Sequence, residues 1–186
     1  VKQRMELSKK GGENCDILVM SATPIPRTLI MTFYGDMDVS KLTEKPSYRK
    51  EIISLSKPDI KIDEVIKFIK KEITNKNQIF WVCPLIDQSK KLDYEAAVKK
   101  FEYLNKIFTG KVGLIHGSLK NEQKEAVLKN FLDKKIQILV STTVIEVGID
   151  FPNANVIVIE NSNKFGLSQL HQLRGRVGRS NMQATC

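Results

Sequence analysis

A short stretch near the C-terminus, residues 171–179, combines residue types and a spacing suited to binding phosphate. It holds three arginines and two glycines within six residues, and no Asp or Glu follows Glu160 to neutralise them. We expect a helix to begin just before this stretch, with Ser168 as its N-cap. If the helix continues to the end of the stretch, Arg176 and Arg179 share one face. Two planar, permanently charged guanidinium groups on one face match the geometry of a phosphate chain.

The two glycines of this stretch, Gly175 and Gly178, favour a functional role. A glycine within a helix costs about 1 kcal/mol relative to alanine, so two of them suggest that something approaches the backbone closely. The alternative, for an isolated arginine pair, is a basic and solvated helix end. The narrow spacing Gln-x-x-Gly-Arg-x-Gly-Arg, from Gln172 to Arg179, favours the functional interpretation.

A second polar stretch, residues 141–150, leaves a predicted strand through three hydroxyl residues. These are Ser141, Thr142 and Thr143, placed where hydroxyls and unpaired backbone N–H groups can donate to phosphate oxygens. Asp150, which ends the stretch, can accept a ribose hydroxyl or pair with an arginine. The alternative that a threonine only caps a short helix stays open.

His116 and Gly117 follow another apolar run. A single histidine at the end of a buried strand is more often a hydrogen-bonded structural residue than a catalytic group. The other interpretation is a contact of Gly117, aided by His116, with a nucleic-acid phosphate. Trp81 lies between Phe80 and Val82, so we expect it in the core and not stacked on a base.

The sequence lacks the motifs that hold a nucleoside triphosphate by themselves. It contains no Gly-x-x-x-x-Gly-Lys-Ser/Thr phosphate loop and no Asp-Glu pair after a strand that would hold Mg²⁺. Arginines that can reach a triphosphate without such a cradle imply a second domain across a cleft. Because Val1 is not an initiator methionine, we expect the chain to be a piece of a longer protein whose missing domain precedes it.

Bulk composition favours a polyanionic partner. The 186 residues carry a formal net charge of +9, and phosphate neutralisation supplies most of the non-specific affinity for nucleic acid. The three cysteines are scattered and the two histidines lie far apart, so we expect no metal site and no disulfide framework. No apolar run is long enough to span a bilayer. We therefore expect a cytoplasmic protein with no membrane partner.

Short apolar runs alternate with amphipathic stretches along the chain. The runs predict strands at residues 16–21, 51–55, 78–83, 111–116, 136–141 and 154–159. Apolar residues spaced at three and four predict helices at residues 26–35, 62–73, 94–108 and 121–132. Such alternation requires right-handed crossovers, so we expect an α/β fold, an open parallel sheet with helices on both faces.

A stretch without clear periodicity, residues 36–47, predicts a linker between two domains. We assign residues 1–45 to the end of a first domain with its linker, and residues 46–186 to a second domain.

Ligands of open parallel sheets bind beyond the carboxyl ends of the strands. The polar residues Ser21-Ala22-Thr23, His116 and Ser141-Thr142-Thr143 all follow predicted strands. We therefore expect them at the ligand-binding edge.

Three motifs resemble those of superfamily 2 helicases. Ser-Ala-Thr-Pro at 21–24, Ser-Thr-Thr-Val-Ile-Glu-Val-Gly-Ile-Asp at 141–150 and Gln-Leu-Arg-Gly-Arg-Val-Gly-Arg at 172–179 are similar to motifs III, V and VI. Longer strings, at 22–29 and 165–179, resemble a bacterial group that comprises helicases of branched DNA and the transcription-repair coupling factor. The strings at 34–40, 83–86 and 92–93 are similar to the branched-DNA helicases in particular.

This resemblance implies two RecA-like domains that clamp ATP between them and translocate on DNA. Residues 1–45 would be the remnant of the first RecA-like domain, whose ATP cradle and Mg²⁺ ligands lie upstream, and residues 46–186 would be the second. The implied partners are DNA, contacted mainly through its phosphate backbone, and the first RecA-like domain of the same protein.

The resemblance also implies roles for the residues that match the motifs. Arg179 would be the arginine finger at the γ-phosphate, with Arg176 beside it and Gln172 sensing the nucleotide. The remaining assignments are Gly148 and Asp150 at the ribose, Ser21, Ala22 and Thr23 in coupling hydrolysis to DNA contact, and His116, Gly117, Thr142 and Thr143 at the DNA backbone.

We accordingly expect part of an ATP-dependent DNA helicase that remodels forks and junctions in recombination and repair. The chain by itself should be inactive as an ATPase. The alternatives are a coupling-factor translocase that moves on duplex DNA, a non-catalytic RecA-like module that binds nucleic acid, and a protein-interaction domain with a basic face.

Overall fold

The computed structural model describes residues 20, 40, 42, 44, 46–84, 90–142 and 151–186, with the side chains of 90–93 left out. The chain divides into two units, Val1–Asp38 and Val39–Cys186, and the fold below is that of the second. The strand predicted at 16–21 and the helix predicted at 26–35 lie outside the described residues. The assignment of residues 1–45 to a first RecA-like domain therefore stays a prediction.

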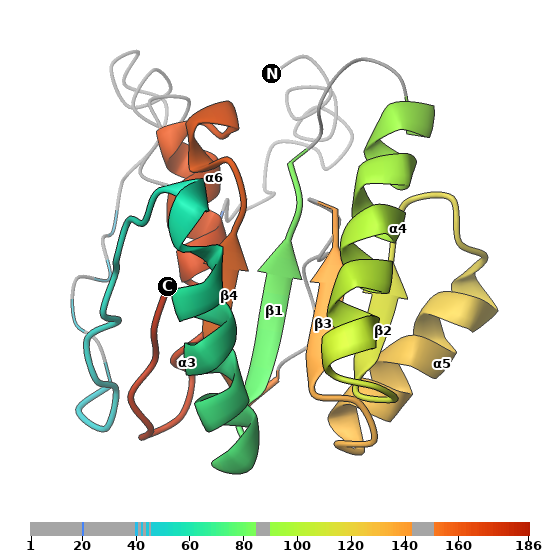
Figure 1. Ribbon diagram of the computed structural model, residues 1–186. Coiled ribbons are helices and arrows are strands. Elements are labelled where there is room, and N and C mark those ends of the chain that lie inside the picture. The colour runs from blue at the N-terminus through green and yellow to red at the C-terminus, as the bar shows by residue number, and fades with distance from the viewer. Residues whose placement is uncertain are drawn as a thin grey trace, which may run out of the picture. The chain divides into compact units, whose positions relative to one another are not determined.

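The centre of the fold is a parallel sheet of β1 (Gln78–Val82), β2 (Val112–Ile115), β3 (Ile138–Ser141) and β4 (Ala154–Ile159). Its order is β2-β3-β1-β4, and each neighbouring pair is parallel. Four of the predicted strands thus form, and the parallel sheet inferred from the sequence is confirmed (Figure 1). All five residues of the central β1 are buried, because helices cover both of its faces, and a strand buried on both faces is a continuous apolar run.

The connecting helices are α3 (Ile62–Thr74), α4 (Lys90–Ile107), α5 (Asn121–Leu132) and α6 (Leu167–Arg174). Two short 3₁₀ turns, η1 (Asp59–Lys61) and η2 (Ser162–Lys164), precede α3 and α6. The α5 bounds agree with those predicted, α3 extends one residue further, and α4 begins four residues earlier than predicted. The spacing of the apolar residues therefore located the helices well.

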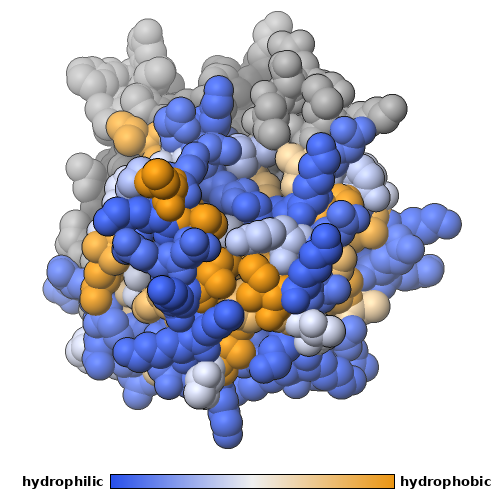
Figure 2. All heavy atoms as spheres, viewed as in Figure 1, coloured by the Kyte–Doolittle hydropathy of each residue, from blue (hydrophilic) through white to orange (hydrophobic). Residues whose placement is uncertain are grey.

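Side chains of β1 alternate between two cores, one on each face of the sheet. Ile79 and Trp81 pack with apolar residues of α3 and α4, whereas Phe80 and Val82 pack with Phe131 of α5 and Leu173 of α6. Figure 1 accordingly shows α3 and α4 on the near side of the sheet and α5 and α6 on the far side. Figure 2 shows the near face, where hydrophilic side chains cover the helices and hydrophobic atoms are visible between them. Helices on both faces and the core position of Trp81 are thereby confirmed.

The segment at 51–55 was predicted to be a strand, and this prediction is wrong. It forms only an isolated bridge at Ile53, opposite Thr185. The partner is the C-terminal segment 184–186, which lies between β4 and residues 53–55: Ile157 N donates to Thr185 O at 2.9 Å, and Ile53 N donates to Ala184 O at 3.0 Å. The end of the chain thus extends the sheet beyond β4.

Among the described residues, no helix combines the length and apolar character needed to cross a membrane.

Candidate functional site

The helix α6 begins one residue after Gly166 and carries the predicted arginine motif at its end. Gly166 occupies the N-cap position, and its N–H donates to Oε1 of Gln169 at 3.0 Å. The prediction of Ser168 as the cap is therefore wrong: Ser168 lies inside the first turn. A glutamine three residues after the N-cap reaches back to satisfy the N-cap N–H, so the helix can begin before the serine.

The helix ends at Arg174 and does not continue to Arg179, contrary to the expectation from spacing. Gly175 N donates to His171 O at 3.1 Å, and Arg176 N then donates to Leu173 O at 3.0 Å, a tighter turn typical of helix ends. Gly178 follows with a φ of 69°, a left-handed conformation that stops a helix. Arg176 and Arg179 therefore belong to a loop, which we call the arginine loop (residues 175–179).

The two arginines of the arginine loop nevertheless influence each other electrostatically. Burial, and secondly the charge of Arg179, lower the pKa of Arg176 below its usual value. Both side chains are half-buried. A like-charged pair of this kind is relieved when an anion binds between the two groups, so the loop is suited to a phosphate.

The two glycines of the motif have different environments. A Cβ atom at Gly178 would lie 3.1 Å from Ala184 Cβ and 3.2 Å from Ile52 Cγ1, so the chain itself makes the close approach expected there. At Gly175 the nearest atom to such a Cβ would be Gln172 O, at 3.4 Å, an ordinary contact. Of the two glycines, Gly178 therefore shows the close approach that we expected, and it is made by side chains of the chain itself.

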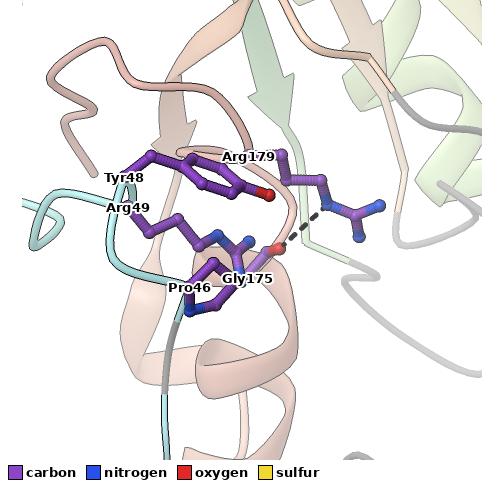
Figure 3. A pocket seen from close by; sticks show the side chains of 5 residues that line it. All are labelled: Pro46, Tyr48, Arg49, Gly175 and Arg179. Carbon is purple, nitrogen blue, oxygen red and sulfur yellow. Dashed lines mark hydrogen bonds between the residues drawn. The ribbon is translucent and has the colours of Figure 1, made fainter.

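A pocket of about 370 Å³ lies beside the arginine loop. It is lined by Pro46, Tyr48, Arg49, Gly175 and Arg179 (Figure 3). Nε of Arg179 donates to Gly175 O at 3.4 Å, and its guanidinium group points away from Tyr48 and Arg49 in this view (Figure 3). Nε of Arg49 donates to Gly178 O at 2.8 Å.

Tyr48 and Arg49 were missed by sequence reasoning, which treated the residues near Pro46 as a domain boundary. An Arg-Lys pair after a proline is not distinctive. Only the fold shows that this segment returns to the arginine loop.

The carboxyl edge of the sheet brings His116 and Thr142 together as predicted. Ile115 pairs with Ser141 in neighbouring parallel strands, so the next residue of each strand emerges at the same edge. Thr142 is 3 % exposed and His116 is 8 % exposed. Gly117 is exposed, as a backbone contact with a strand of nucleic acid requires.

His116 is packed as a neutral ring. It meets Tyr94 edge-to-face, with 4.6 Å between the ring centroids. Burial, and secondly the charge of Lys124, lower its pKa. Its Nδ1 has no hydrogen-bond partner within the described part of the chain, and the same holds for the buried Ser141 Oγ. The edge therefore contains polar atoms still able to accept or donate a hydrogen bond.

A half-buried ion pair lies near the carboxyl end of β4. Lys100 Nζ is 2.5 Å from Glu160 Oε1, and the lysine also lies 5.3 Å from the centroid of the Trp81 ring. Cys83 Sγ donates to Glu160 Oε2 at 3.6 Å. Burial, with Glu160 second, raises the pKa of Cys83 to about 12. This thiol is therefore protonated and is not a nucleophile at neutral pH.

Six of the predicted site residues lie outside the described part of the chain: Ser21, Ala22, Thr23, Thr143, Gly148 and Asp150. Gln172 is exposed on α6. The roles assigned to all of these residues stay predictions.

A magnesium site finds no support in the described ranges. Within the described residues, no three His, Cys, Asp or Glu side chains are grouped so that they could hold a metal ion.

The fold and the arginine loop match a known class. Residues 60–181 match the model of the helicase conserved C-terminal domain, and the chain belongs to that family. Yeast Dbp5 bound to RNA and ADP BeF3 shares the fold, with a TM-score of 0.66 and 15% identity over 99% of this chain and 47% of that chain.

The chain is also similar to ATP-dependent DNA helicase RecG, as the motif strings indicated. The chain is 52% identical over 188 residues to RecG of Thermotoga maritima and 47% identical over 188 residues to that of Bacillus subtilis. Both matches cover the whole of this chain, but this chain covers only 24% of the Thermotoga protein and 27% of the Bacillus protein. A structure of RecG bound to a three-way DNA junction matches with a TM-score of 0.76 and 50% identity, over 95% of this chain and 23% of that chain.

Proposed function

We propose that this chain is the second RecA-like domain of an ATP-dependent DNA helicase of the RecG type. The observation that carries the proposal is the arginine loop, which presents Arg176 and Arg179 three positions apart, both half-buried, with Arg179 lining a pocket. Guanidinium groups presented from one such loop suit the γ-phosphate of a nucleotide held by another domain. A non-catalytic binding module would not require this pair.

The proposed mechanism has two states. ATP, held by a first RecA-like domain that precedes this one, draws the two domains together. Arg176 and Arg179 then meet the negative charge that develops on the transferred phosphoryl group, which in other nucleotidases accelerates hydrolysis by about 10³–10⁵-fold. Gln172 contacts the nucleotide, and Gly148 and Asp150 contact the ribose. Release of the products opens the cleft.

In this mechanism the carboxyl edge of the sheet binds DNA. Thr142, Thr143, His116 and Gly117 contact the phosphate backbone, and Ser21, Ala22 and Thr23 couple these contacts to hydrolysis. Contacts with phosphates and not with base edges carry little sequence preference. Each cycle of closing and opening moves these contacts by one step along the DNA strand.

The proposed substrate is branched DNA. A RecG relative was solved on a three-way DNA junction, and the RecG relatives match this chain from end to end. Both observations favour a helicase of branched DNA over a coupling-factor translocase.

Arg179→Ala in the full-length protein tests the finger assignment. We expect DNA-stimulated ATP hydrolysis to fall by about 10³-fold or more, because the developing charge loses its stabilising cation. The matched control is Lys164→Ala, which removes one positive charge from the exposed η2 turn and should keep wild-type activity. Steady-state phosphate release measures both variants. Hydrolysis by Arg179→Ala within a few-fold of wild type would show that Arg179 is not the finger.

A further inference from the structure

The segment that precedes η1 is bonded directly to the arginine loop. Arg49 Nε donates to the carbonyl oxygen of Gly178 at 2.8 Å, across 129 positions of sequence. The turn that presents Arg49 is closed by its own backbone N–H, which donates to Pro46 O at 2.9 Å. A segment distant in sequence thus fixes the peptide that leads into Arg179.

Gly178 is also held from its other side. A Cβ on this residue would lie 3.1 Å from Ala184 Cβ and 3.2 Å from Ile52 Cγ1, which is tighter than an ordinary contact. Ile53 N and Cys186 N donate to Ala184 O and Ile53 O at 3.0 and 2.8 Å, which ties the two flanking segments together. Gly178, with its φ at 69°, therefore accepts a hydrogen bond from Arg49 at its carbonyl and is closely flanked by Ile52 and Ala184.

We propose that Arg49 is a positioning residue for Arg179. The carbonyl of Gly178 belongs to the peptide unit that carries the N–H of Arg179, so its orientation sets the direction in which the Arg179 side chain leaves the backbone. A guanidinium group suits this task because its planar donors have a fixed geometry, in contrast to the freely rotating ammonium of lysine. The inference rests on the proposed finger role of Arg179.

Arg49 is separable from the packing that holds the domain together. Its side chain is half-buried and lines the open pocket of Figure 3, and it belongs to neither apolar core. Loss of the hydrogen bond should therefore displace the arginine loop without unfolding the sheet. A displacement of about 1 Å at a catalytic group can cost on the order of 10²-fold in rate.

The test uses five variants of the full-length protein: Arg49→Met, Arg49→Lys, Arg179→Ala, the double variant Arg49→Met/Arg179→Ala, and Lys50→Met as the matched control. Lys50 is the exposed neighbour of Arg49. We expect Arg49→Met to lower kcat of DNA-stimulated ATP hydrolysis by about 10–100-fold, with KM for ATP changed less than threefold. Arg49→Lys, which can still donate to Gly178 O, should recover part of kcat, and Lys50→Met should behave as wild type.

The double variant and thermal unfolding show whether a lower kcat in Arg49→Met comes from a misplaced Arg179 or from a less stable fold. If Arg49 acts through Arg179, the double variant is no slower than Arg179→Ala alone. The inference is overturned if Arg49→Met keeps kcat within twofold of wild type, or if the kcat losses of Arg49→Met and Arg179→Ala multiply in the double variant. It is also overturned if kcat among the Arg49 variants follows their Tm and not their ability to donate a hydrogen bond to Gly178 O. An active Arg179→Ala would instead refute the proposed finger, whatever Arg49 does. A slow Arg179→Ala beside a fully active Arg49→Met would refute only the positioning role.

Discussion

At the scale of single residues, neighbouring charge and burial determine what each group can do. Arg176 is destabilised as a cation by burial and by Arg179, which an anionic ligand would relieve. Cys83, by contrast, is held protonated by burial beside Glu160. Burial, and secondly the charge of Lys124, lower the pKa of His116.

The lowered pKa of His116 predicts a stability that depends on pH. Above its ordinary pKa of 6.5 the ring is neutral in both states. As pH falls through 6.5, the unfolded chain takes up a proton that the folded protein resists, so the free energy of unfolding decreases. Urea unfolding at pH 7.5 and 5.5 should show a smaller decrease for His116→Gln than for wild type. His171→Gln, at an exposed position of α6, is the control and should keep the wild-type decrease; equal decreases in all three proteins would contradict this prediction.

At the scale of elements, α6 and the arginine loop depend on two glycines in different ways. Gly178 has a left-handed backbone and little space for a side chain. Gly175 has a φ of −69° at the helix end, which any residue adopts. The backbone conformation therefore favours glycine at position 178 but not at position 175.

Paired substitutions to alanine test this difference. Gly178→Ala should lower the free energy of unfolding by about 1–3 kcal/mol, because a non-glycine residue is strained at positive φ. Gly175→Ala should leave it unchanged or raise it by up to about 1 kcal/mol, because alanine restricts the unfolded chain. Chemical denaturation of both variants measures the two values. Equal losses would show that Gly175 is also constrained.

At the scale of the whole molecule, the proposed phosphate contacts of the arginine loop are not accompanied by a phosphate-loop motif anywhere in the sequence. The 186 residues together carry a net charge of +9. Binding of DNA and hydrolysis of ATP should therefore be separable in this chain, because the first needs only phosphate contacts and the second needs a further domain.

The purified chain tests this separation. We expect it to bind DNA with an affinity that falls steeply as salt concentration rises, because bound phosphates release counterions. We expect no ATP turnover above background, with or without DNA. Fluorescence anisotropy across a salt series and phosphate release measure the two properties. Turnover by the chain itself would contradict the need for a second domain, and salt-independent binding would favour a protein-interaction role.

Much of the fold could be read from the sequence because its signals are local. Short apolar runs such as 78–82 are typical of buried strands, and apolar residues spaced at three and four, as in α3, are typical of a helix that buries one side. The segment at 51–55 forms a bridge and not the predicted strand, because the extent of its pairing is set by a C-terminal segment more than 130 positions away. Its local pattern could not show how short that pairing would be.

The sequence by itself determined the α/β class, the parallel sheet, the edge that carries His116 and Thr142, and the motif that contains Arg176 and Arg179. Only the tertiary structure decided that α6 ends at Arg174, because the spacing of the arginines does not determine the sign of φ at Gly178. It also decided that Arg49 holds the arginine loop. A hydrogen bond between segments so far apart forms only after the sheet has brought both of them to one edge.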